Sequence, residues 1–576
     1  MEIFKQYTQL TKKIFSILTY KQRVGLFYLF FLMIIGALFE LVGIGLVIPL
    51  LNLLINDSSS SEIFIFNYFY ERYEKRDIVL LLLAFIIIFY LFKTILMSFI
   101  LWFKIIYYEK IIKYLSAKLF KKYLNQDYLF HISRNTSELL TNIKINITEF
   151  SQLGINSFLS LSTEILIILF IITFLFFYQP YSTLVVVFLL VLIAFIFNRI
   201  FNKKVKQSGK ESIFHTKMYQ QTLTQGLQNF KEIQLLGRQQ DFVDSFNIHV
   251  EKNMKINSRN TFIQQIPRVW LELILILLLI LTIGIFVLIE INYNDILITM
   301  GLYAVVGIKL MPSIARMATY IQRINFHIPK IHLIYNELNL KENDRSNNIN
   351  EKFLLKKEIE LKDISFGYSQ NNLNIFEKVN FKFKVNDKVG IVGDSGSGKS
   401  TLMDILLGLI NPISGQVNID GIDIKDVKNQ WQNNIGYVPQ NIMMIDDTIL
   451  KNVAFGYEKD KIDIQRINKS LVQSDLFNFI NSLPQGVETN VGEFGSSLSG
   501  GQLQRIGIAR ALYSNPDILF LDEPSSALDI NSEKNIIDSL MKLKDKTIFI
   551  ISHRIQSLEK CDYIIKIGKG KIEILK

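Results

Sequence analysis

A glycine-rich run in the C-terminal half of the chain has the residue types and spacing that bind phosphate. Residues 393–401 read GDSGSGKST, between the apolar stretches 389–392 and 402–407. This order predicts a strand, a tight turn and a helix, the context that the P-loop pattern G-x-x-x-x-G-K-S requires. Lys399 is expected to reach the β- and γ-phosphates and Ser400 to hold Mg²⁺, while backbone N–H groups cradle the oxygens. The predicted phosphate contacts are Gly393, Asp394, Ser395, Gly396, Ser397, Gly398, Lys399, Ser400 and Thr401.

Two further runs carry chemistry of the same kind. Residues 518–523 form an apolar strand pattern that ends in Asp522 and Glu523. Asp522 is placed to hold Mg²⁺, and Glu523 is placed to polarise the attacking water. Residues 498–502 read LSGGQ before a helical run, so they predict a second phosphate-binding helix start. Its expected contacts are Ser499, Gly500, Gly501 and Gln502.

Length and composition place these runs in a membrane protein of more than one domain. The chain has 576 residues, 49% of them hydrophobic, and a mean hydropathy of +0.26, which is high for a soluble protein. The net charge of +11 fits basic cytoplasmic loops better than a nucleic-acid partner, because the cations gather in loops. The single cysteine excludes an intrachain disulfide.

The N-terminal part predicts six membrane spans. Residues 1–23 read as an amphipathic helix on the inner membrane surface, and residues 56–77 as an external segment. Lys and Arg concentrate in the loops 104–144 and 199–268, so the positive-inside rule places both termini in the cytoplasm. We expect these long loops to be helical pairs that turn back near residues 126–133 and 218–227. The predicted spans are 24–55, 78–103, 155–178, 181–198, 269–289 and 296–315.

The remaining chain changes character after a charged, Asn-rich linker. We expect a transmembrane domain over residues 1–335, a linker over 336–351 and an α/β domain over 352–576. The fold class is therefore an α-helical membrane domain with six transmembrane helices, fused to an α/β P-loop domain.

The motifs of the C-terminal domain resemble the ATP-binding cassette of ABC proteins. The likeness rests on the P-loop, on LSGGQ followed by QRIGIARA, and on the strand ending LDEP. It implies that Tyr368 stacks on adenine, that Gln440 senses Mg²⁺, and that His553 contacts the γ-phosphate. Asp529 matches the D-loop, and Leu503 departs from the polar residue that usually follows the signature.

The family resemblance also implies how the parts work together. ATP is held between the P-loop of one cassette and the signature of another, so the resemblance implies a homodimer. Six spans ahead of one cassette resemble the exporter half-transporters. The implied cofactors are ATP and Mg²⁺. The expected catalytic residues are Glu523, His553, Lys399 and Gln440, and the expected metal-binding residues are Ser400, Gln440 and Asp522.

Ionisable residues in or beside the spans give the clue to the cargo, because charges at membrane depth are costly. Arg268, Lys309 and Arg316 would form a basic cavity for an anionic, phosphate-bearing lipid. The structural alternative is that they snorkel to headgroups or pair with glutamates. Further ionisable candidates are Glu40, Lys93, Glu164 and Glu272.

A narrower resemblance favours one class of cargo. Residues 39–44 with Pro49, residues 266–272, and residues 310–313 with Arg316 are similar to bacterial flippases of lipid-linked oligosaccharides. The likeness implies that a polyprenyl-pyrophosphate glycan moves from the cytoplasmic to the outer leaflet of the inner membrane. A general exporter of lipids or amphipathic drugs is one alternative, and a regulatory ABC ATPase that moves nothing is another.

Overall fold

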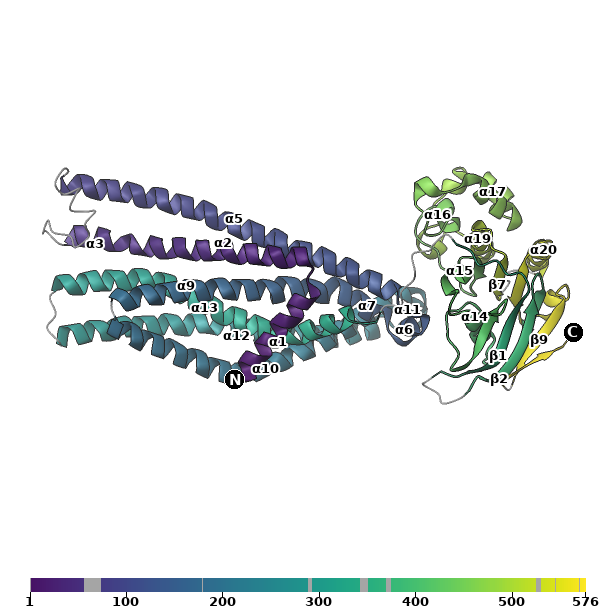
Figure 1. Cartoon of the computed structure of the whole chain (residues 1–576), viewed down its shortest axis with the longest axis horizontal. Helices are drawn as coiled ribbons and strands as arrows, with labels where there is room; N and C mark the ends of the chain where they lie inside the picture. The colour runs from purple at the N-terminus through teal and green to yellow at the C-terminus, as the bar shows by residue number, and fades with distance from the viewer. Residues whose placement is uncertain are drawn as a thin grey trace. The chain divides into compact units, whose positions relative to one another are not determined.

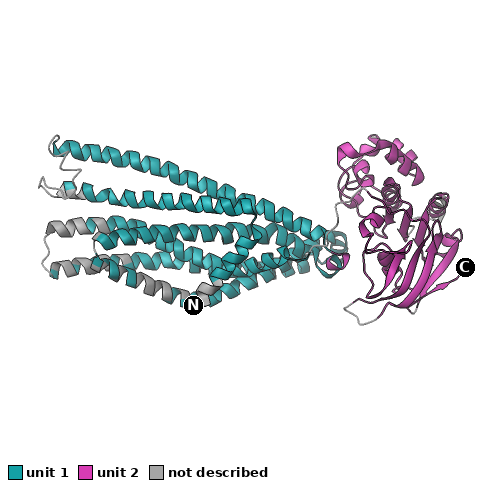
Figure 2. Cartoon of the chain, in the orientation of Figure 1, with its two compact units in different colours: residues 1–126, 131–342 teal, residues 127–130, 343–576 magenta. Residues whose placement is uncertain are grey.

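The computed structural model divides the chain into two compact units (Figure 2). One unit holds residues 1–126 and 131–342, and the other holds residues 127–130 and 343–576. The structure describes residues 2–55, 74–178, 180–288, 293–341, 351–368, 374–524, 530–543, 545–568 and 570–575. Most of the predicted external segment 56–77 lies outside them, and so do residues 179 and 290–292, which separate predicted spans.

The first unit is built from long helices (Figure 1). Among the described residues, four helical stretches are long and apolar enough to cross a bilayer: Tyr20–Leu50, Lys75–Leu124, Thr136–Phe177 and Ala304–Leu338. The described parts of the predicted spans 181–198 and 269–289 lie within long helices but outside these four stretches, so both spans stay predictions. The main helices are α1 (Glu2–Ile17), α2 (Tyr20–Gly45), α3 (Val47–Ile55), α5 (Lys75–Leu124), α9 (Asn156–Tyr178), α10 (Pro180–Gln228), α12 (Gln239–Leu288) and α13 (Tyr293–Leu338).

The N-terminal helix buries the face that its sequence predicts. Leu10, Ile14 and Ile17 are at most 6% exposed. The helix is shorter than the predicted 1–23, because Thr19 starts a new one. The Thr19 hydroxyl accepts from the Gln22 backbone N–H, and the Gln22 side chain accepts from the Thr19 N–H. This capping box satisfies two N–H groups that a helix start leaves unpaired.

Only one of the two long helical pairs turns where the sequence predicts. The first turns within 126–133 as expected, where α5 ends at Leu124 and the short helix α6 (Tyr128–Ser133) begins soon after. The second expectation, 218–227, is wrong, because α10 continues through it and α11 (Phe230–Leu236) comes next. Gly237 ends α11 with φ of +65°, the left-handed conformation that stops a helix.

Close packing in the first unit depends on one glycine of α10. A Cβ added to Gly209 would lie 2.0 Å from the carbonyl oxygen of Phe326 in α13.

Two π-helices, η1 (Asn142–Asn146) and η2 (Phe150–Ile155), interrupt the segment before α9. The short helix α7 (Thr136–Thr141) precedes them, and α8 (Ile147–Glu149) lies between them. Glu149 of α8 forms an ion pair with the buried Lys330 of α13.

The second unit carries two sheets with helices against them (Figure 1). An antiparallel sheet has the order β2-β1-β4-β5, and the larger sheet has the order β10-β9-β3-β8-β7-β6. In the larger sheet β9, β3, β8, β7 and β6 are parallel, and β10 is an antiparallel edge strand. The strands are β1 (Glu358–Phe366), β2 (Phe376–Lys384), β3 (Lys388–Val392), β4 (Ser414–Ile419), β5 (Ile422–Asp423), β6 (Ile435–Val438), β7 (Ile518–Asp522), β8 (Thr547–Ile551), β9 (Tyr563–Gly568) and β10 (Lys571–Ile574).

The helices of the second unit are mostly short. They are α14 (Lys399–Leu406), α15 (Lys428–Gln432), α16 (Ile449–Val453), α17 (Ile464–Gln473), α18 (Phe477–Ser482), α19 (Gly500–Tyr513) and α20 (Ile530–Met541), with 3₁₀ turns at Lys459–Lys461, Gly486–Glu488, Glu493–Gly495 and Ile555–Leu558.

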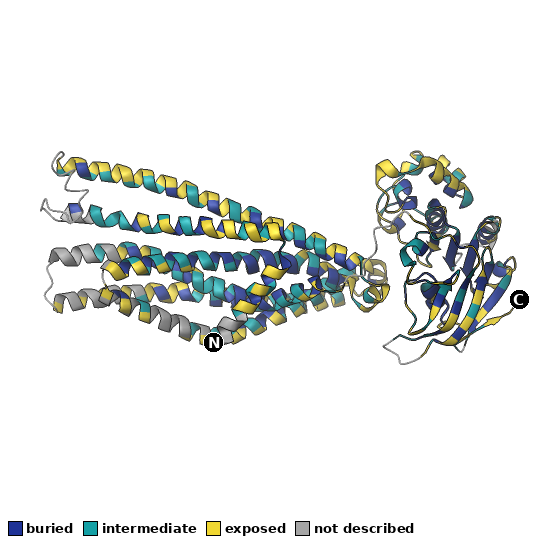
Figure 3. Cartoon of the chain, viewed as in Figure 1, coloured by how far each residue is buried: buried dark blue, intermediate teal, exposed yellow. Residues whose placement is uncertain are grey.

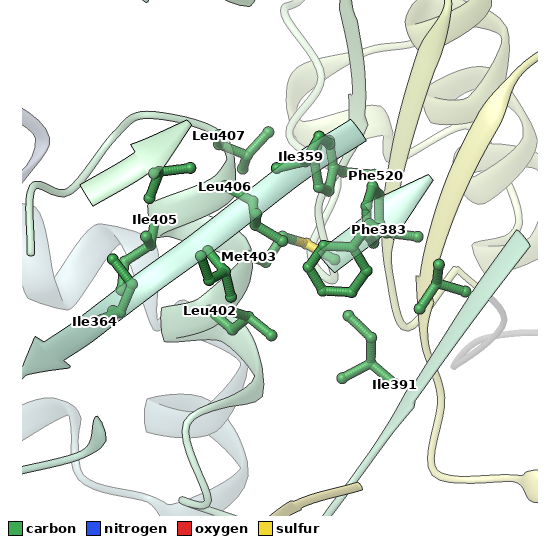
Figure 4. Close-up of a cluster of buried hydrophobic side chains, with 14 of the residues drawn as sticks. Ile359, Ile364, Phe383, Ile391, Leu402, Met403, Ile405, Leu406, Leu407 and Phe520 are labelled. Carbon is green, nitrogen blue, oxygen red and sulfur yellow. The ribbon is translucent and has the colours of Figure 1, made fainter. Parts of the chain in front are cut away.

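The central strands of the larger sheet are buried along their whole length (Figure 3). Their side chains pack with both the smaller sheet and α14. Phe383, Ile391 and Phe520 share one cluster with Leu402 and Leu406 (Figure 4). Burying each such side chain stabilises the fold by about 1.5–3 kcal/mol. The cluster therefore fixes the ends of β3 and β7, where the predicted phosphate-binding and acidic residues begin.

A second cluster lies on the other side of the same strands. It contains Leu519 and Ile550 together with Leu558, Cys561 and Ile564. Cys561 is 4% exposed, so its thiol belongs to the core of this unit.

Candidate active site

The predicted phosphate loop connects β3 to α14, as the sequence pattern requires. Gly396 and Gly398 have φ of +80° and +103°, and a Cβ on Gly398 would lie 2.5 Å from Ile375. Lys399 Nζ donates to the carbonyl oxygens of Gly393 at 2.8 Å and Asp394 at 2.9 Å.

One polar atom of this loop points to a ligand. Ser397 Oγ is buried and has no hydrogen-bond partner among the described residues. An unpaired buried hydroxyl is costly, and a phosphate oxygen would supply its acceptor. The loop therefore fits a phosphate group.

Ser400 and Asp522 meet at the start of α14 and the end of β7. Burial raises the pKa of Asp522 and the neighbouring Glu523 raises it further, while the charge of Lys399 and a hydrogen bond from Ser400 oppose the rise. Burial and the charge of Asp522 also raise the pKa of Asp404 to about 6. A divalent cation would offset this crowding of carboxylates, and hydroxyl and carboxylate oxygens are the ligands that Mg²⁺ prefers. These residues therefore fit Mg²⁺.

Sequence reasoning missed Asp404. Its signal is an acid within the apolar run 402–407, one helical turn after Ser400. Its raised pKa makes it part of the electrostatics of the site.

Two side chains that lie far from Glu523 in the sequence, Gln440 and His553, meet at its carboxylate. His553 Nε2 lies 2.7 Å from Glu523 Oε1, and the Gln440 amide nitrogen donates to Glu523 Oε2 at 2.8 Å. These residues follow β8, β6 and β7, whose carboxyl ends share one edge of the sheet. Glu523 has φ of +49°, and its N–H donates to the Ile551 carbonyl at 3.0 Å. The carboxylate is thus fixed from two sides, and Gln440 faces it through its amide.

The predicted signature residues start α19 and are open to solvent. Ser499 is the N-cap of this helix, and its side chain and that of Gln502 form a capping box. Within the described part of the chain, no hydrogen bond or ion pair joins residues 498–502 to residues 393–401. The two phosphate-binding devices are therefore separate features of one chain.

The remaining predicted residues of this unit have mixed outcomes. Tyr368 packs edge-on against Phe366, with ring centroids 5.1 Å apart. Leu503 is half-buried in an apolar cluster, and a Cβ on Gly495 would lie 2.3 Å from it. An apolar residue therefore suits position 503. Asp529 lies outside the described residues.

The predicted basic residues of the first unit are mostly paired with glutamates. Arg316 forms a bidentate ion pair with Glu164, at 2.6 and 3.1 Å. Lys309 Nζ lies 3.1 Å from Glu40, which also pairs with Lys93. For Lys309 and Arg316 the structure thus shows the alternative of pairing.

Arg268 is different, because its side chain is exposed and has no ion-pair partner among the described residues. The pair with Glu272 that their spacing of one turn suggests does not form. The predicted basic residues therefore do not gather into one cluster of free cations.

Comparison with known proteins covers both units. The family model of the ABC transporter transmembrane region matches residues 26–308, and the model of the ABC transporter matches residues 376–526. The chain has both domains of an ABC exporter half-transporter. The expected fold class, a helical membrane domain fused to an ATP-binding cassette, is confirmed, and the number of transmembrane helices is not settled by these matches.

Individual relatives match parts of the chain. This ABC transporter is 40% identical over 220 residues to ABC transporter B family member 29, chloroplastic, of Arabidopsis thaliana, covering 38% of this chain and 35% of that protein. It is 32% identical over 352 residues to an ATP-dependent lipid A-core flippase of Saccharophagus degradans, covering 61% and 59%. The chain thus spans less than two thirds of the length of these relatives.

A solved structure matches nearly the whole ABC transporter. The structure of a bacterial Atm1-family ABC exporter with ATP bound has a TM-score of 0.77, with 96% of this chain and 94% of that chain covered. The sequence identity is 19%, so the likeness establishes the exporter fold.

Proposed function

We propose that this ABC transporter hydrolyses ATP and uses the energy to move an anionic lipid out of the cytoplasmic leaflet of the bacterial inner membrane. The observation that carries the ATPase is the position of Glu523, held by Gln440 and His553 beside the phosphate loop. A carboxylate fixed in this way can accept the proton of an attacking water.

The other residues of the site have complementary roles in this proposal. Lys399 leaves the carbonyls of its own loop and reaches the nucleotide phosphates, while Ser397 supplies a hydroxyl donor. Ser400 and Asp522 hold Mg²⁺, which would neutralise charge that develops on the phosphates. His553 orients Glu523, and Tyr368 supports the adenine.

The complete site needs a second chain. The signature at Ser499 makes no hydrogen bond or ion pair with the phosphate loop among the described residues, and its helix start is solvent-exposed. We propose that the signature of one protomer covers the nucleotide of its partner in a homodimer, with both cassettes in the cytoplasm. Closing on ATP and reopening after hydrolysis would then drive the membrane helices.

For the cargo we propose a lipid-linked oligosaccharide with a polyprenyl-pyrophosphate carrier. Arg268 is exposed, and Lys309 and Arg316 each hold a glutamate that a pyrophosphate can replace. Arg and Lys bind phosphate oxygens through charge-assisted hydrogen bonds, so exchange of carboxylate for pyrophosphate conserves the number of pairs. The carboxylates would keep the cations compensated when no cargo is present.

A second candidate is a lipid of the lipid A-core type. The observation that favours it is the 32% identity to a lipid A-core flippase over 352 residues. A regulatory ATPase without cargo is less favoured, because Glu523 and His553 are both in place.

Reconstitution in proteoliposomes tests the proposal. We would measure ATP hydrolysis together with the movement of three lipids: a polyprenyl-pyrophosphate oligosaccharide, a lipid A-core lipid and a fluorescent phospholipid. The proposal expects ATP-dependent movement of the glycan lipid. Movement of only the lipid A-core lipid would establish the second candidate, and hydrolysis without movement of any lipid would support the regulatory alternative.

A matched pair of variants separates cargo binding from structural pairing. Arg316→Gln should abolish movement of the glycan lipid while basal hydrolysis continues, whereas Glu164→Gln should preserve it, since a free Arg316 still binds phosphate. Lys309→Gln and Arg268→Gln should resemble Arg316→Gln. Equal loss in Arg316→Gln and Glu164→Gln would show that the ion pair itself is what movement requires.

A further inference from the structure

A basic cavity lies in the cassette, apart from the residues assigned above. Its volume is about 470 Å³, which is in the range of small-molecule pockets. Lys352, Arg466 and Lys469 line it, and none of its lining side chains carries a negative charge. Polar neutral residues complete the wall, including Asn433, Tyr457 and Gln473.

The cations of the cavity are held by contacts among three segments: the residues before β1, the residues after α19, and α17. Lys352 precedes β1, and its Nζ donates to the carbonyl oxygens of Ser514 at 2.9 Å and Asn515 at 3.0 Å, just after α19. Arg466 lies in α17, where Asp463 at the helix start pairs with it at 3.1 Å.

Lys469 lies one turn further along α17. It has no hydrogen-bond or ion-pair partner in the described part of the chain. The cavity thus holds one ammonium without a partner among the described residues, beside Arg466, whose ion pair with Asp463 is exposed to solvent, and Lys352, which donates to two carbonyl oxygens.

A fourth cation adds to the positive potential. Lys546 donates to Asn515 Oδ1 at 3.3 Å and to the Pro516 carbonyl oxygen. Burial lowers the pKa of Lys546, Asp517 opposes this, and the charges of Lys352 and Lys469 lower it further. Burial likewise lowers the pKa of Lys352, Asp517 opposes this, and the charge of Arg466 lowers it further. A bound anion would relieve this repulsion.

We propose that this cavity binds a small phosphate-bearing polyanion. Lys469 and Arg466 present charge-assisted donors to phosphate oxygens, and Lys352, from a different segment of the chain, adds a third positive charge to the lining. The exposed ring of Tyr457 offers an apolar face to the rest of the ligand. Lys352 and residues 512–515 connect the cavity to the end of the helix that begins at the signature. The ligand would therefore fix α17 against α19.

The binding test uses the full-length chain in nanodiscs, with inorganic pyrophosphate as the probe. Lys399→Ala serves as the background, because it removes the principal cation of the phosphate loop. Calorimetric titration should show one pyrophosphate bound per chain. Adding Arg466→Gln and Lys469→Gln should weaken this binding at least about tenfold, because two charge-assisted donors are lost.

The control pair Lys459→Gln and Lys461→Gln makes the same change of net charge on a 3₁₀ turn outside the cavity. It should leave the affinity within about twofold, since both side chains are exposed and neither lines the cavity. Gln473→Glu, which adds a negative charge to the cavity wall, should also weaken binding. Unchanged affinity in the Arg466 and Lys469 variant, or an equal loss in the control pair, would overturn the proposal.

Discussion

The decisive residue of the active site is Glu523, and its neighbours explain why its position is so well defined. Gln440 and His553 each hold one carboxylate oxygen, at 2.8 and 2.7 Å. The carboxylate therefore has little freedom to leave the position from which it would accept a proton.

Replacing this carboxylate tests its role. Glu523→Gln should lower ATP hydrolysis about 100-fold or more, because the amide cannot accept the proton of water. ATP binding should persist, since no predicted phosphate contact is changed. Phosphate release and binding of a fluorescent ATP analogue provide the two measurements. Glu488→Gln, an exposed control in the 3₁₀ turn Gly486–Glu488, should leave both unchanged. Hydrolysis at the normal rate in Glu523→Gln would place the base elsewhere.

Asp404 gives the site a pH dependence in the absence of nucleotide and metal. Burial and Asp522 raise its pKa to about 6 from an ordinary 3.8. A raised acid pKa means that folding favours the protonated form, so stability from this group is present below pH 3.8 and lost as pH rises through about 6.

Asp404→Asn should remove the loss of stability that the charged carboxylate causes at neutral pH. Because the carboxyl is partly exposed, we expect a gain of about 1 kcal/mol at pH 7.5, shrinking toward pH 4. Thermal unfolding in EDTA, followed by tryptophan fluorescence at both pH values, measures it. Asp426→Asn changes an exposed acid and should have no such effect. A gain of equal size at both pH values would contradict the assignment to Asp404.

At the residue scale, the sequence predicted features built from neighbouring residues better than contacts between residues that are far apart along the chain. The phosphate loop was predictable because nine consecutive residues carry it. The placement of Glu523 between Gln440 and His553 required the family resemblance, since these residues follow three different strands. The ion pair of Arg316 with Glu164 was only one of the alternatives left open, because no local pattern links residues 152 positions apart.

At the scale of helices, the hydrophobic periodicity of the sequence predicted which segments are helical better than it predicted where each helix ends. The helix α10 continues through residues 218–227 because this polar stretch contains no strong helix breaker, and its Gly226 is tolerated within the helix. The helix α10 ends at Gln228, one residue beyond the expected turn, and the short α11 that follows ends at Gly237, a glycine in the left-handed conformation. The π-helices around α8 left no recognisable signal in the sequence.

The contact between α10 and α13 can be tested with two glycines of one helix. Gly209→Ala places a Cβ 2.0 Å from the Phe326 carbonyl oxygen, so the helices must separate. We expect a loss of about 1–3 kcal/mol, as for other overpacked sites. Gly226→Ala meets its nearest atom at 3.5 Å and should be neutral or stabilising, because alanine favours helix. Thermal inactivation in detergent compares them, and equal midpoints would show that the contact adapts without cost.

At the scale of the whole molecule, the separation of the phosphate loop from the signature predicts complementation between chains. Lys399→Ala disables the phosphate loop. Ser499→Glu disables the signature, because glutamate would repel the phosphate. Each variant alone should lack hydrolysis. Mixed dimers regain one intact site, so random pairing should restore about a quarter of normal activity if the sites act independently.

The control for this mixture is a chain that carries both substitutions. Combined with Lys399→Ala chains, it offers no working phosphate loop and should restore nothing. No restored hydrolysis in the mixture of Lys399→Ala and Ser499→Glu chains would contradict a site shared between two chains. Activity is measured after co-reconstitution from a common detergent pool, so that protomers exchange before the lipid is added.

The buried position of Cys561 has a practical consequence for experiments on this transporter. It is the only cysteine of the chain, and it is 4% exposed within the cassette core. A maleimide should therefore leave the native chain unlabelled and react only when the cassette opens. Spectroscopic labels can then be introduced by adding one surface cysteine, with the natural residue retained in the core it helps to fill.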